Sequence, residues 1–348
     1  MKNISELDEN FKVGGTIARD GMKFFDAEKA PFSIHGVFRE GEKFRRLPES
    51  VAKSVSVGVH GLHANTAGGR LRFRTDSPYV AVSAKMSSIG KMSHFAYTGS
   101  VGFDLYADNR YTGSFVPPHG ITDGYESILN LDERKMREIT IDFPLYSEVE
   151  RLVIGLDGDS SLEAPTPYKI EKPVVFYGSS ITQGGCASRP GSCYQPIVAR
   201  RFGFDFINLG FSGNAKGEDI MADYIAGLDM SAFVYDYDYN APSAEHLEKT
   251  HERMFLRIRA KNPTLPIIMM SRPKHLLTAD EQHRLEIIRS TYNNAVASGD
   301  KNVYFLDGAA LTALSGNEGT VDTVHPTDFG FASMAKALGD LIEKEGIL

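Results

Sequence analysis

The chain has 348 residues, of which 42% are hydrophobic and 24% charged, with a formal net charge of −7 at pH 7. Charges of both signs are spread along it, which excludes the basic blocks that bind nucleic acid or an anionic membrane. The length suffices for two hydrophobic cores, and no apolar run approaches the roughly 18 residues that cross a bilayer. Because the amino terminus also lacks the apolar segment of a secretory signal, we expect a two-domain cytoplasmic protein that acts on a small molecule. The sequence does not decide whether copies of the chain form a homo-oligomer.

Residues 1–165 have the pattern of an all-β domain. Short runs of alternating apolar and polar residues, separated by turn formers such as Gly68-Gly69, predict strands. Many short strands without helical stretches are typical of an antiparallel sandwich or jelly roll. We also expect the part of this domain around residues 92–106 to lean over the crevice of the second domain. The predicted strands cover residues 54–57, 71–74, 79–84, 138–143 and 151–156.

Residues 166–348 have the pattern of an α/β domain, after a linker rich in turn formers and proline at 157–167. Strands alternate with amphipathic helices, and Thr278 with Glu281 predicts a capping box at the start of one helix. This alternation predicts parallel strands joined by right-handed crossovers, in a three-layer α/β/α arrangement. The predicted strands cover residues 174–177, 206–209, 232–236, 266–271 and 303–306, and the last helix covers 329–345.

Ser180 is the candidate nucleophile. It follows the strand 174–177 almost directly, at the carboxyl end, where open α/β sheets bind their ligands. A serine pair between a strand and a helix is, however, also typical of helix capping, which is the commoner role for such a motif alone. The catalytic interpretation therefore depends on partners elsewhere in the chain.

Asp322 and His325 are the candidate partners. They stand three residues apart, so the carboxylate can hold one imidazole nitrogen and leave the other to act as a base. A serine hydroxyl needs such a base before it can attack a carbonyl carbon. The alternative is that both residues only cap a helix that Thr327 begins.

Two further strand ends carry candidate hydrogen-bond donors. Gly213 follows the strand 206–209, where the missing side chain can leave its backbone N–H accessible. Asn240 follows the strand 232–236, and its amide can donate to a developing oxyanion. Both residues also suit ordinary turns. Arg189, close after Ser180, is a candidate for substrate binding, with a solvated loop arginine as the alternative.

The sequence does not indicate a bound cofactor or metal ion. Phosphate loops and dinucleotide fingerprints are absent from the sequence. His60 and His63 have a spacing that can bind metal, but without a third ligand nearby a turn is favoured. Cys186 and Cys193 are too few for a disulfide framework, so free thiols are favoured over a local bridge. We expect neither a cofactor nor a resident metal ion.

Taken together, these blocks resemble the SGNH (GDSL-like) hydrolases. The segment Gly178-Ser179-Ser180-Ile181, then Gly213, Asn240 and Asp322-x-x-His325, follow the order of the four blocks of that family. The resemblance implies a flavodoxin-like three-layer fold and a serine esterase or deacylase of acetylated carbohydrates, with no cofactor. It implies Ser180 as nucleophile, His325 as general base and acid, and Asp322 as the residue that orients the imidazole. The backbone N–H groups of Ser180 and Gly213, with the Asn240 amide, would form the oxyanion hole.

The resemblance extends upstream, with two departures from the family pattern. Gly102-Phe103-Asp104-Leu105-Tyr106 is similar to the Gly-x-Asp-Leu-Tyr signature of a subgroup with an amino-terminal β-sandwich. Ser179 replaces the Asp of the Gly-Asp-Ser-Leu motif, which does not affect the nucleophile. The segment 238–241 replaces the Gly-x-Asn-Asp block, which leaves the choice between Asn240 and another oxyanion donor open.

The resemblance therefore implies a serine esterase that hydrolyses small O-acyl groups, above all O-acetyl groups, on a carbohydrate. Two alternatives remain. An acyltransferase would use the same triad but pass the acyl group to an alcohol or amine instead of water. A non-catalytic carbohydrate-binding protein would use the sandwich for binding and the α/β domain as a scaffold.

Overall fold

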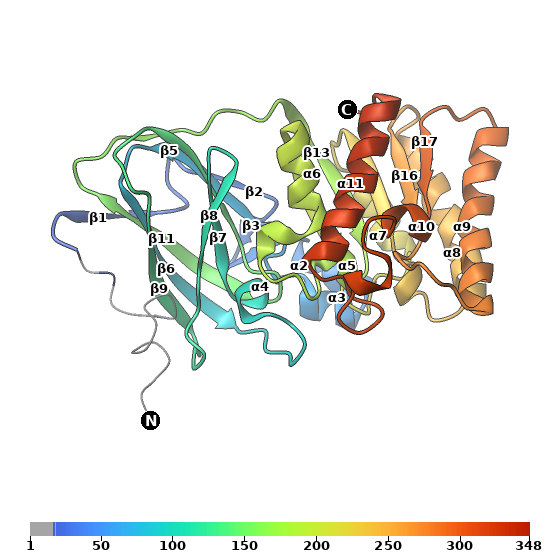
Figure 1. The fold of residues 1–348 in the computed structure, drawn as a ribbon. Helices are drawn as coiled ribbons and strands as arrows, with labels where there is room; N and C mark the ends of the chain where they lie inside the picture. Colours follow the sequence, from blue (N-terminus) through green and yellow to red (C-terminus); the bar gives the residue numbers. More distant parts are fainter. Residues whose placement is uncertain (1–16, 18) are drawn as a thin grey trace.

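The computed structural model describes residue 17 and residues 19–348. They form a β-rich half followed by an α/β half, which lie side by side (Figure 1). The β-rich half contains two large antiparallel sheets, one in the order β1-β11-β6-β9 and one in the order β12-β5-β10-β7-β8 with β2 paired to β5, and a small antiparallel sheet of β3 and β4. Its strands are β1 (Met22–Asp26), β2 (Ser33–His35), β3 (Phe38–Glu40), β4 (Lys43–Arg45), β5 (Arg70–Thr75), β6 (Tyr79–Ser88), β7 (Phe103–Ala107), β8 (Arg110–Phe115), β9 (Gly124–Asn130), β10 (Arg137–Asp142), β11 (Glu148–Asp157) and β12 (Leu162–Glu163).

The two sheets share one hydrophobic core. Every second residue of a strand points to the same face of its sheet, so Phe73 and Ile139 of one sheet meet Val82 and Ile154 of the other. All four side chains are fully buried. This confirms the predicted antiparallel sandwich and four of its five predicted strands.

The predicted strand at 54–57 is wrong, because these residues belong to the helices α2 (Glu49–Val55) and α3 (Val57–Leu62). The apolar residues Val51, Val55, Val59 and Leu62 recur at helical spacing, a pattern longer than the four-residue window that suggested a strand. Ser56 separates the helices, and its hydroxyl caps α3 by accepting from the Val59 N–H at 3.1 Å. Both helices pack into the core of the α/β half, although they precede the predicted linker.

The α/β half is built on a five-stranded parallel sheet in the order β14-β13-β15-β16-β17. In sequence order this is 2-1-3-4-5, the flavodoxin-like arrangement, whose ligand crevice lies where the strand order reverses, beside β13. The strands are β13 (Ile170–Gly178), β14 (Phe204–Gly210), β15 (Ala232–Asp236), β16 (Ile267–Met270) and β17 (Val303–Leu306). The α-helices of this half are α5 (Ser180–Gln183), α6 (Tyr194–Phe202), α7 (Asp219–Ala226), α8 (Ala244–Lys261), α9 (Ala279–Ala297), α10 (Gly308–Leu311) and α11 (Asp328–Glu345), and α4 (Tyr97–Ser100) lies in the β-rich half.

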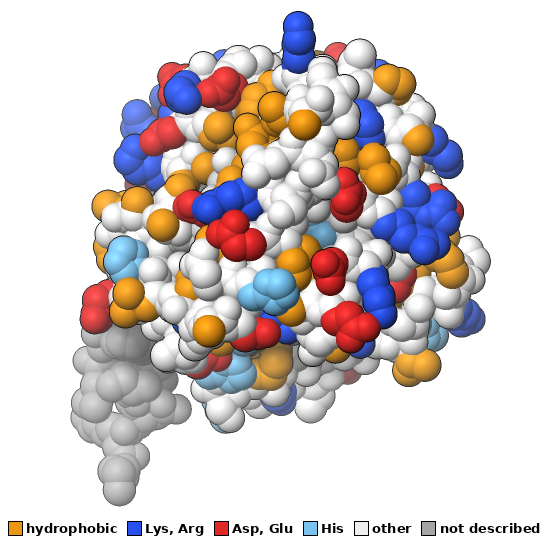
Figure 2. Space-filling model, turned by 90° about the vertical axis from the view of Figure 1, so that its right-hand side faces the viewer, with side chains coloured by type: hydrophobic (Ala, Val, Ile, Leu, Met, Phe, Trp, Pro, Cys, Tyr) orange, Lys and Arg blue, Asp and Glu red, His pale blue; other side chains and the backbone are white. Residues whose placement is uncertain are grey.

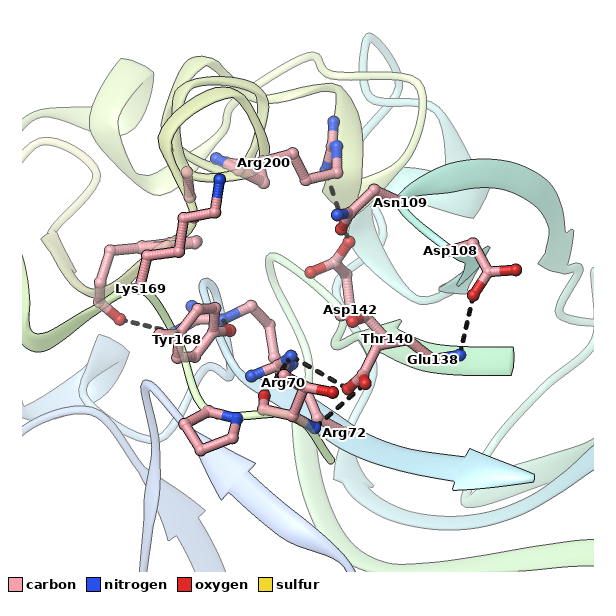
Figure 3. A pocket seen from close by; sticks show the side chains of 16 residues that line it. Arg70, Arg72, Asp108, Asn109, Glu138, Thr140, Asp142, Tyr168, Lys169 and Arg200 are labelled. Carbon is pink, nitrogen blue, oxygen red and sulfur yellow. Dashed lines mark hydrogen bonds and ion pairs between the residues drawn. The ribbon is translucent and has the colours of Figure 1, made fainter. Parts of the chain in front are cut away.

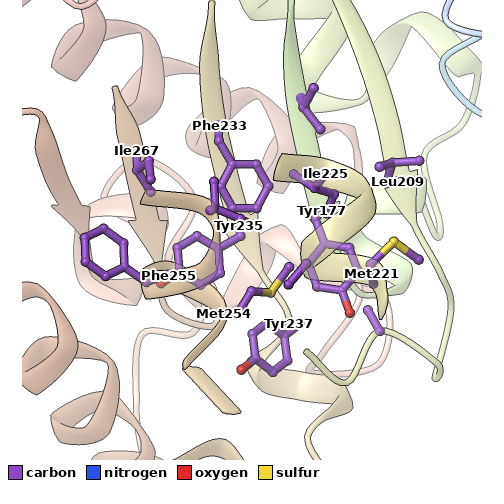
Figure 4. Close-up of a cluster of buried hydrophobic side chains, with 14 of the residues drawn as sticks. Tyr177, Leu209, Met221, Ile225, Phe233, Tyr235, Tyr237, Met254, Phe255 and Ile267 are labelled. Carbon is purple, nitrogen blue, oxygen red and sulfur yellow. The ribbon is translucent and has the colours of Figure 1, made fainter. Parts of the chain in front are cut away.

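Helices cover both faces of this sheet, which explains why its strands are apolar throughout. Val175 and Tyr177 of β13 point toward α7, α8 and α9, in the cluster that Figure 4 shows. Val174 and Phe176 point the opposite way, toward α6, α10 and α11. The predicted capping box at Thr278 and the three-layer arrangement are thereby confirmed.

Arg46 joins the two halves at the level of the crevice. Its side chain is fully buried and donates hydrogen bonds to the carbonyl oxygens of Leu62, Asn65, Asn208 and Gly210 at 2.6–3.0 Å. Burial lowers the pKa of this guanidinium to about 9. Because these acceptors come from both halves, the single side chain fixes the end of β14 against the amino-terminal part of the chain.

The surface carries charges of both signs. On the face at the far end of the α/β half, Figure 2 shows Lys, Arg, Asp and Glu side chains interspersed. Within the described residues, no helix combines the length and the apolar composition that crossing a membrane requires.

Candidate active site

Ser180 lies at the carboxyl end of β13, as the first residue of α5. The neighbouring Ser179 caps this helix, since its hydroxyl accepts from the Ile181 N–H at 3.1 Å. The Ser180 hydroxyl is therefore not used for capping, and it lies 2.8 Å from the Nε2 atom of His325. Gly184 then ends the helix in the left-handed conformation (φ 108°), where a Cβ atom would clash with the Cys193 sulfur at 2.5 Å.

His325 and Asp322 lie in a tight loop before α11. The loop is closed by a hydrogen bond from the Val321 N–H to the His325 carbonyl at 2.9 Å. The second imidazole nitrogen, Nδ1, lies 2.7 Å from Asp322 Oδ2, and Asp322 Oδ1 accepts from the backbone N–H groups of Val324 and His325. Burial would raise the pKa of Asp322, but the hydrogen bonds from His325 and Val324 outweigh it and lower this pKa. The carboxylate thus stays ionised and holds the imidazole with Nε2 toward Ser180.

The candidate oxyanion donors lie on the strands beside β13. Gly178 pairs with Gly210 of β14 on one side and with Asp236 of β15 on the other, so the three following loops start at one level. Within the described chain, the backbone N–H groups of Ser180 and Gly213 donate to no protein acceptor. Ser180 opens a helix, and the first N–H groups of a helix lack partners inside it. Gly213 is exposed and has a φ of 70°, which suits glycine.

The Asn240 amide connects two of these loops. One of its N–H bonds donates to the Phe211 carbonyl at 2.9 Å, and the other has no acceptor within the described residues. Asn240 ends the short 3-10 helix η3 (Asp238–Asn240), which follows β15. The structure thus brings Ser180, His325 and Asp322 together directly, and it places Gly213 and Asn240 on the adjoining loops.

Two positioning residues escaped the sequence analysis. Gln183 is fully buried, and its Oε1 accepts from the Ser212 N–H at 3.0 Å, which fixes the loop just before Gly213. Asp238 accepts two hydrogen bonds from Arg272, both at 2.8 Å, and this buried pair anchors η3 and therefore Asn240. The sequence carried only a weak signal for Gln183, a polar residue shortly after a predicted buried strand, and none for Asp238.

The β-rich half contributes the wall beside the imidazole. In the loop between β6 and α4, the ring of His94 lies 5.8 Å from that of His325, and the ring of Phe95 lies 6.2 Å away, between ring centroids. Phe95 packs edge-on against Tyr146 at 4.7 Å, and the Tyr146 hydroxyl donates to the Ser180 carbonyl at 3.3 Å. The predicted approach of the segment around residues 92–106 to the crevice is confirmed for residues 94 and 95.

Two family models match the chain. The GDSL-like lipase/acylhydrolase family matches residues 171–343, and the amino-terminal domain of SGNH-hydrolase-type esterases, named GxDLY, matches residues 22–162. The chain belongs to the GDSL-like SGNH hydrolases. The resemblance based on its sequence motifs is thereby confirmed, and this is a family of ester hydrolases. The two matches leave residues 163–170 between them, so the domain boundary at 165 stays a prediction.

Solved structures share the fold of this GDSL-like hydrolase across nearly its whole length. A Bacteroides ovatus protein described as a GDSL-like lipase is 29% identical with a TM-score of 0.83, over 93% of this chain and 98% of its own. A salicylyl-acyltransferase from a tetracycline biosynthetic pathway is 20% identical with a TM-score of 0.76, over 95% and 99%. A family two carbohydrate esterase from Cellvibrio japonicus is 12% identical with a TM-score of 0.63, over 94% and 98%. No curated protein matches the sequence significantly.

The Gly-x-Asp-Leu-Tyr segment of this hydrolase holds the loop that follows α5. Asp104 is fully buried and accepts from Arg189 Nη1 at 3.0 Å and from the Gly191 N–H at 2.9 Å. The Arg189 guanidinium also donates to the Tyr106 hydroxyl and lies 3.8 Å from the centre of the Tyr111 ring. These contacts indicate that Arg189 joins the two halves. A role for it in substrate binding stays a prediction, and the contacts do not favour it.

The other sequence candidates have local roles. His60 and His63 lie at the end of α3, not in a β-turn, with rings stacked 5.0 Å apart. The His63 Nδ1 contacts the His60 carbonyl, and its Nε2 contacts Arg45. Cys186 and Cys193 are buried, and both are free thiols, as favoured above.

A cavity of about 400 Å³, lined mostly by polar and charged residues, lies between the sandwich and α6, and none of the candidate active-site residues lines it. Figure 3 shows Asp142 of β10 pointing into it. Asp142 Oδ2 has no hydrogen-bond partner within the described part of the chain, and the nearest cationic nitrogen, Arg200 Nη1, is 4.0 Å away. Burial raises the pKa of Asp142 to about 6.

Asp142→Asn is expected to stabilise the protein more at high pH than at low pH. The folded-state pKa lies above the ordinary value, so the stability that protonated Asp142 contributes is full below about pH 4 and is lost as the pH rises through about 6. The difference between the folded-state pKa and the ordinary pKa of Asp142 corresponds to roughly 3 kcal/mol of folding free energy between low and high pH. Urea unfolding of both proteins at about pH 4 and about pH 8 measures it. A free-energy difference between variant and wild type that stays constant with pH would contradict it.

Proposed function

We propose that this GDSL-like hydrolase is a serine esterase that removes small O-acyl groups, above all O-acetyl groups, from carbohydrates, with Ser180, His325 and Asp322 as its catalytic triad. The observation that carries the proposal is the continuous chain of contacts from the Ser180 hydroxyl to His325 at 2.8 Å and from His325 to Asp322 at 2.7 Å. The first distance suits proton transfer from Ser180 to His325, and the second suits the hydrogen bond by which Asp322 orients the imidazole.

The mechanism follows from these contacts. His325 Nε2 takes the Ser180 proton while Oγ bonds to the ester carbonyl carbon, and Asp322 stabilises the imidazolium that forms. The carbonyl oxygen becomes an oxyanion, which the N–H groups of Ser180 and Gly213 and the Asn240 amide stabilise. The C–O bond to the alcohol breaks, and the alcohol leaves with the proton from His325. Water then repeats the two steps on the acyl-enzyme and releases the acid and free Ser180.

The preference for a short acyl group rests on the wall beside His325. The Phe95 ring lies 6.2 Å from the His325 ring and packs on Tyr146 at 4.7 Å, and we infer that this aromatic wall leaves less room for a long acyl chain than for a short one. The carbohydrate rests on analogy: the family two carbohydrate esterase from Cellvibrio japonicus has the same two-part fold. The mixed surface charge also favours a neutral substrate over a polyanion.

Hydrolysis of a 4-nitrophenyl acyl series from acetate to octanoate tests the proposal, with Ser180→Ala measured in parallel. We expect the acetate ester to give the highest kcat/KM of the series. We also expect the enzyme to release acetate from an acetylated oligosaccharide in a second assay. A rate that rises with chain length would contradict the acyl preference. Product analysis with added sugar acceptor separates hydrolysis from acyl transfer, and labelling of Ser180 by a fluorophosphonate separates both from a non-catalytic binding protein.

A further inference from the structure

Three side chains with metal-binding atoms converge beside Ser180. His94 comes from the loop between β6 and α4, Cys186 from the segment after α5, and His325 from the loop before α11. One nitrogen or sulfur atom from each lies within 4.8 Å of the other two. Imidazole nitrogen and thiolate sulfur are the donors that zinc and similar late transition metals prefer, so this set differs from the acidic groups common on protein surfaces.

The distances between the three ligand atoms would suit a tetrahedrally coordinated ion once these atoms move slightly closer together. Zinc binds imidazole nitrogen at ~2.0–2.1 Å and thiolate sulfur at ~2.3 Å, so its ligand atoms lie roughly 3.3–3.7 Å from one another. Cys186 is 7% exposed and His325 is held by its contacts, but His94 is exposed on a loop. A rotation of the His94 side chain can therefore supply most of the closer approach.

An ion at this position would conflict with the proposed catalysis. Both His325 nitrogens are in use, Nε2 with the Ser180 hydroxyl and Nδ1 with Asp322. Whichever nitrogen binds the ion, His325 loses either the serine whose proton it takes or the carboxylate that orients it. The mechanism above needs both contacts, so the metal-bound form would be inactive.

We propose that His94, Cys186 and His325 form a binding site for a zinc-class ion, and that an ion bound there inhibits the enzyme reversibly. On binding, the Cys186 thiol releases its proton to solvent and binds the ion as a thiolate. The inhibitory half of this proposal rests on the proposed esterase function. The binding half does not, because it concerns the three ligands alone.

Cobalt(II) spectroscopy tests the binding half. Protein treated with EDTA and then titrated with Co²⁺ should develop the thiolate-to-cobalt absorption band and tetrahedral d–d bands with one ion per chain, and Zn²⁺ should abolish them. Cys186→Ser should lose the thiolate band, and His94→Ala should weaken binding at least about tenfold, the lower loss seen even for outer-shell partners. A titration without the thiolate band, or one unchanged by Cys186→Ser, overturns the site.

Two controls keep the result specific. His283→Ala removes an exposed histidine on α9, at the opposite end of the molecule from the sandwich, and should bind cobalt as the wild type does (Figure 1). Ser180→Ala removes no ligand, so it should also bind cobalt while lacking esterase activity. Circular dichroism shows whether Cys186→Ser folds, and His94→Ala tests the site independently because His94 is exposed.

Inhibition of 4-nitrophenyl acetate hydrolysis tests the second half. One equivalent of Zn²⁺ should inhibit the wild type and His283→Ala, EDTA should restore activity, and the ratio of rates with and without Zn²⁺ should approach one in His94→Ala and Cys186→Ser. If cobalt binds as expected but Zn²⁺ leaves the active wild type unaffected, the inhibitory role is wrong. If the wild type has no esterase activity, the proposed function fails and the cobalt result stands by itself.

Discussion

Replacing Ser180 by alanine is expected to lower esterase turnover by roughly 10⁴- to 10⁶-fold, the range found when a single residue of a catalytic triad is removed. In the proposed mechanism this hydroxyl bonds to the substrate, and no other hydroxyl within the described chain contacts His325 Nε2. The rest of the site is unchanged and can still bind the ester, so KM should change much less than kcat. Hydrolysis of 4-nitrophenyl acetate under saturating conditions measures both values.

Ser179→Ala is the matched control for this experiment. Ser179 is also a buried serine, one residue away, but its hydroxyl caps α5 and does not contact His325. Its loss should cost about 1 kcal/mol of stability, as for other caps, and leave most of the turnover. Comparable losses of turnover in Ser179→Ala and Ser180→Ala would mean that the turn, and not the Ser180 hydroxyl, determines activity.

His325→Ala and the double variant test whether serine and histidine act as one unit. Neither residue is useful without the other, since the imidazole has to take the proton that the hydroxyl gives up. The double variant should therefore be about as slow as either single variant, not slower by the product of the two effects. Multiplicative losses would contradict a shared proton transfer.

The placement of the central candidate residues could be predicted from the sequence because it depends on strand ends. Ser180, Gly213 and Asn240 each follow a strand that the apolar pattern locates, and the carboxyl ends of parallel strands meet at one edge. His325 and Asp322 could be paired because they are three residues apart. Local patterns of this kind also predicted the sandwich and the capping box at Thr278.

The rest depends on contacts between distant segments, which local patterns do not encode. An arginine is usually exposed, and the sequence around Arg46 gives no sign of an exception. In the structure Arg46 is buried and donates to carbonyl oxygens of β14, some 160 residues later in the chain. The sequence around Asp238 also does not indicate that this residue forms an ion pair with Arg272. The helices at 49–62 were missed because the four residues 54–57, seen alone, alternate like a strand. The helical spacing becomes visible only over the longer segment, whose apolar residues pack into the core of the α/β half.

Asn240→Ala is expected to reduce kcat by roughly 100- to 1,000-fold with little change in KM, the usual effect of removing one oxyanion-hole donor. The amide N–H that has no protein acceptor would hydrogen-bond to the oxygen only once it carries charge, so the loss falls on the transition state. Steady-state kinetics with 4-nitrophenyl acetate separate kcat from KM. Asn240→Asp, which keeps the size but replaces the donor by an acceptor, should be at least as slow.

The competing explanation is that Asn240 only ties two loops together through its bond to the Phe211 carbonyl at 2.9 Å. Losing a hydrogen bond of that kind costs about 1 kcal/mol of stability and would leave kcat near the wild-type value. Unfolding measurements beside the kinetics therefore decide between the two roles. A variant that is less stable but turns over normally would remove Asn240 from the oxyanion hole and leave the N–H groups of Ser180 and Gly213 to stabilise the oxyanion.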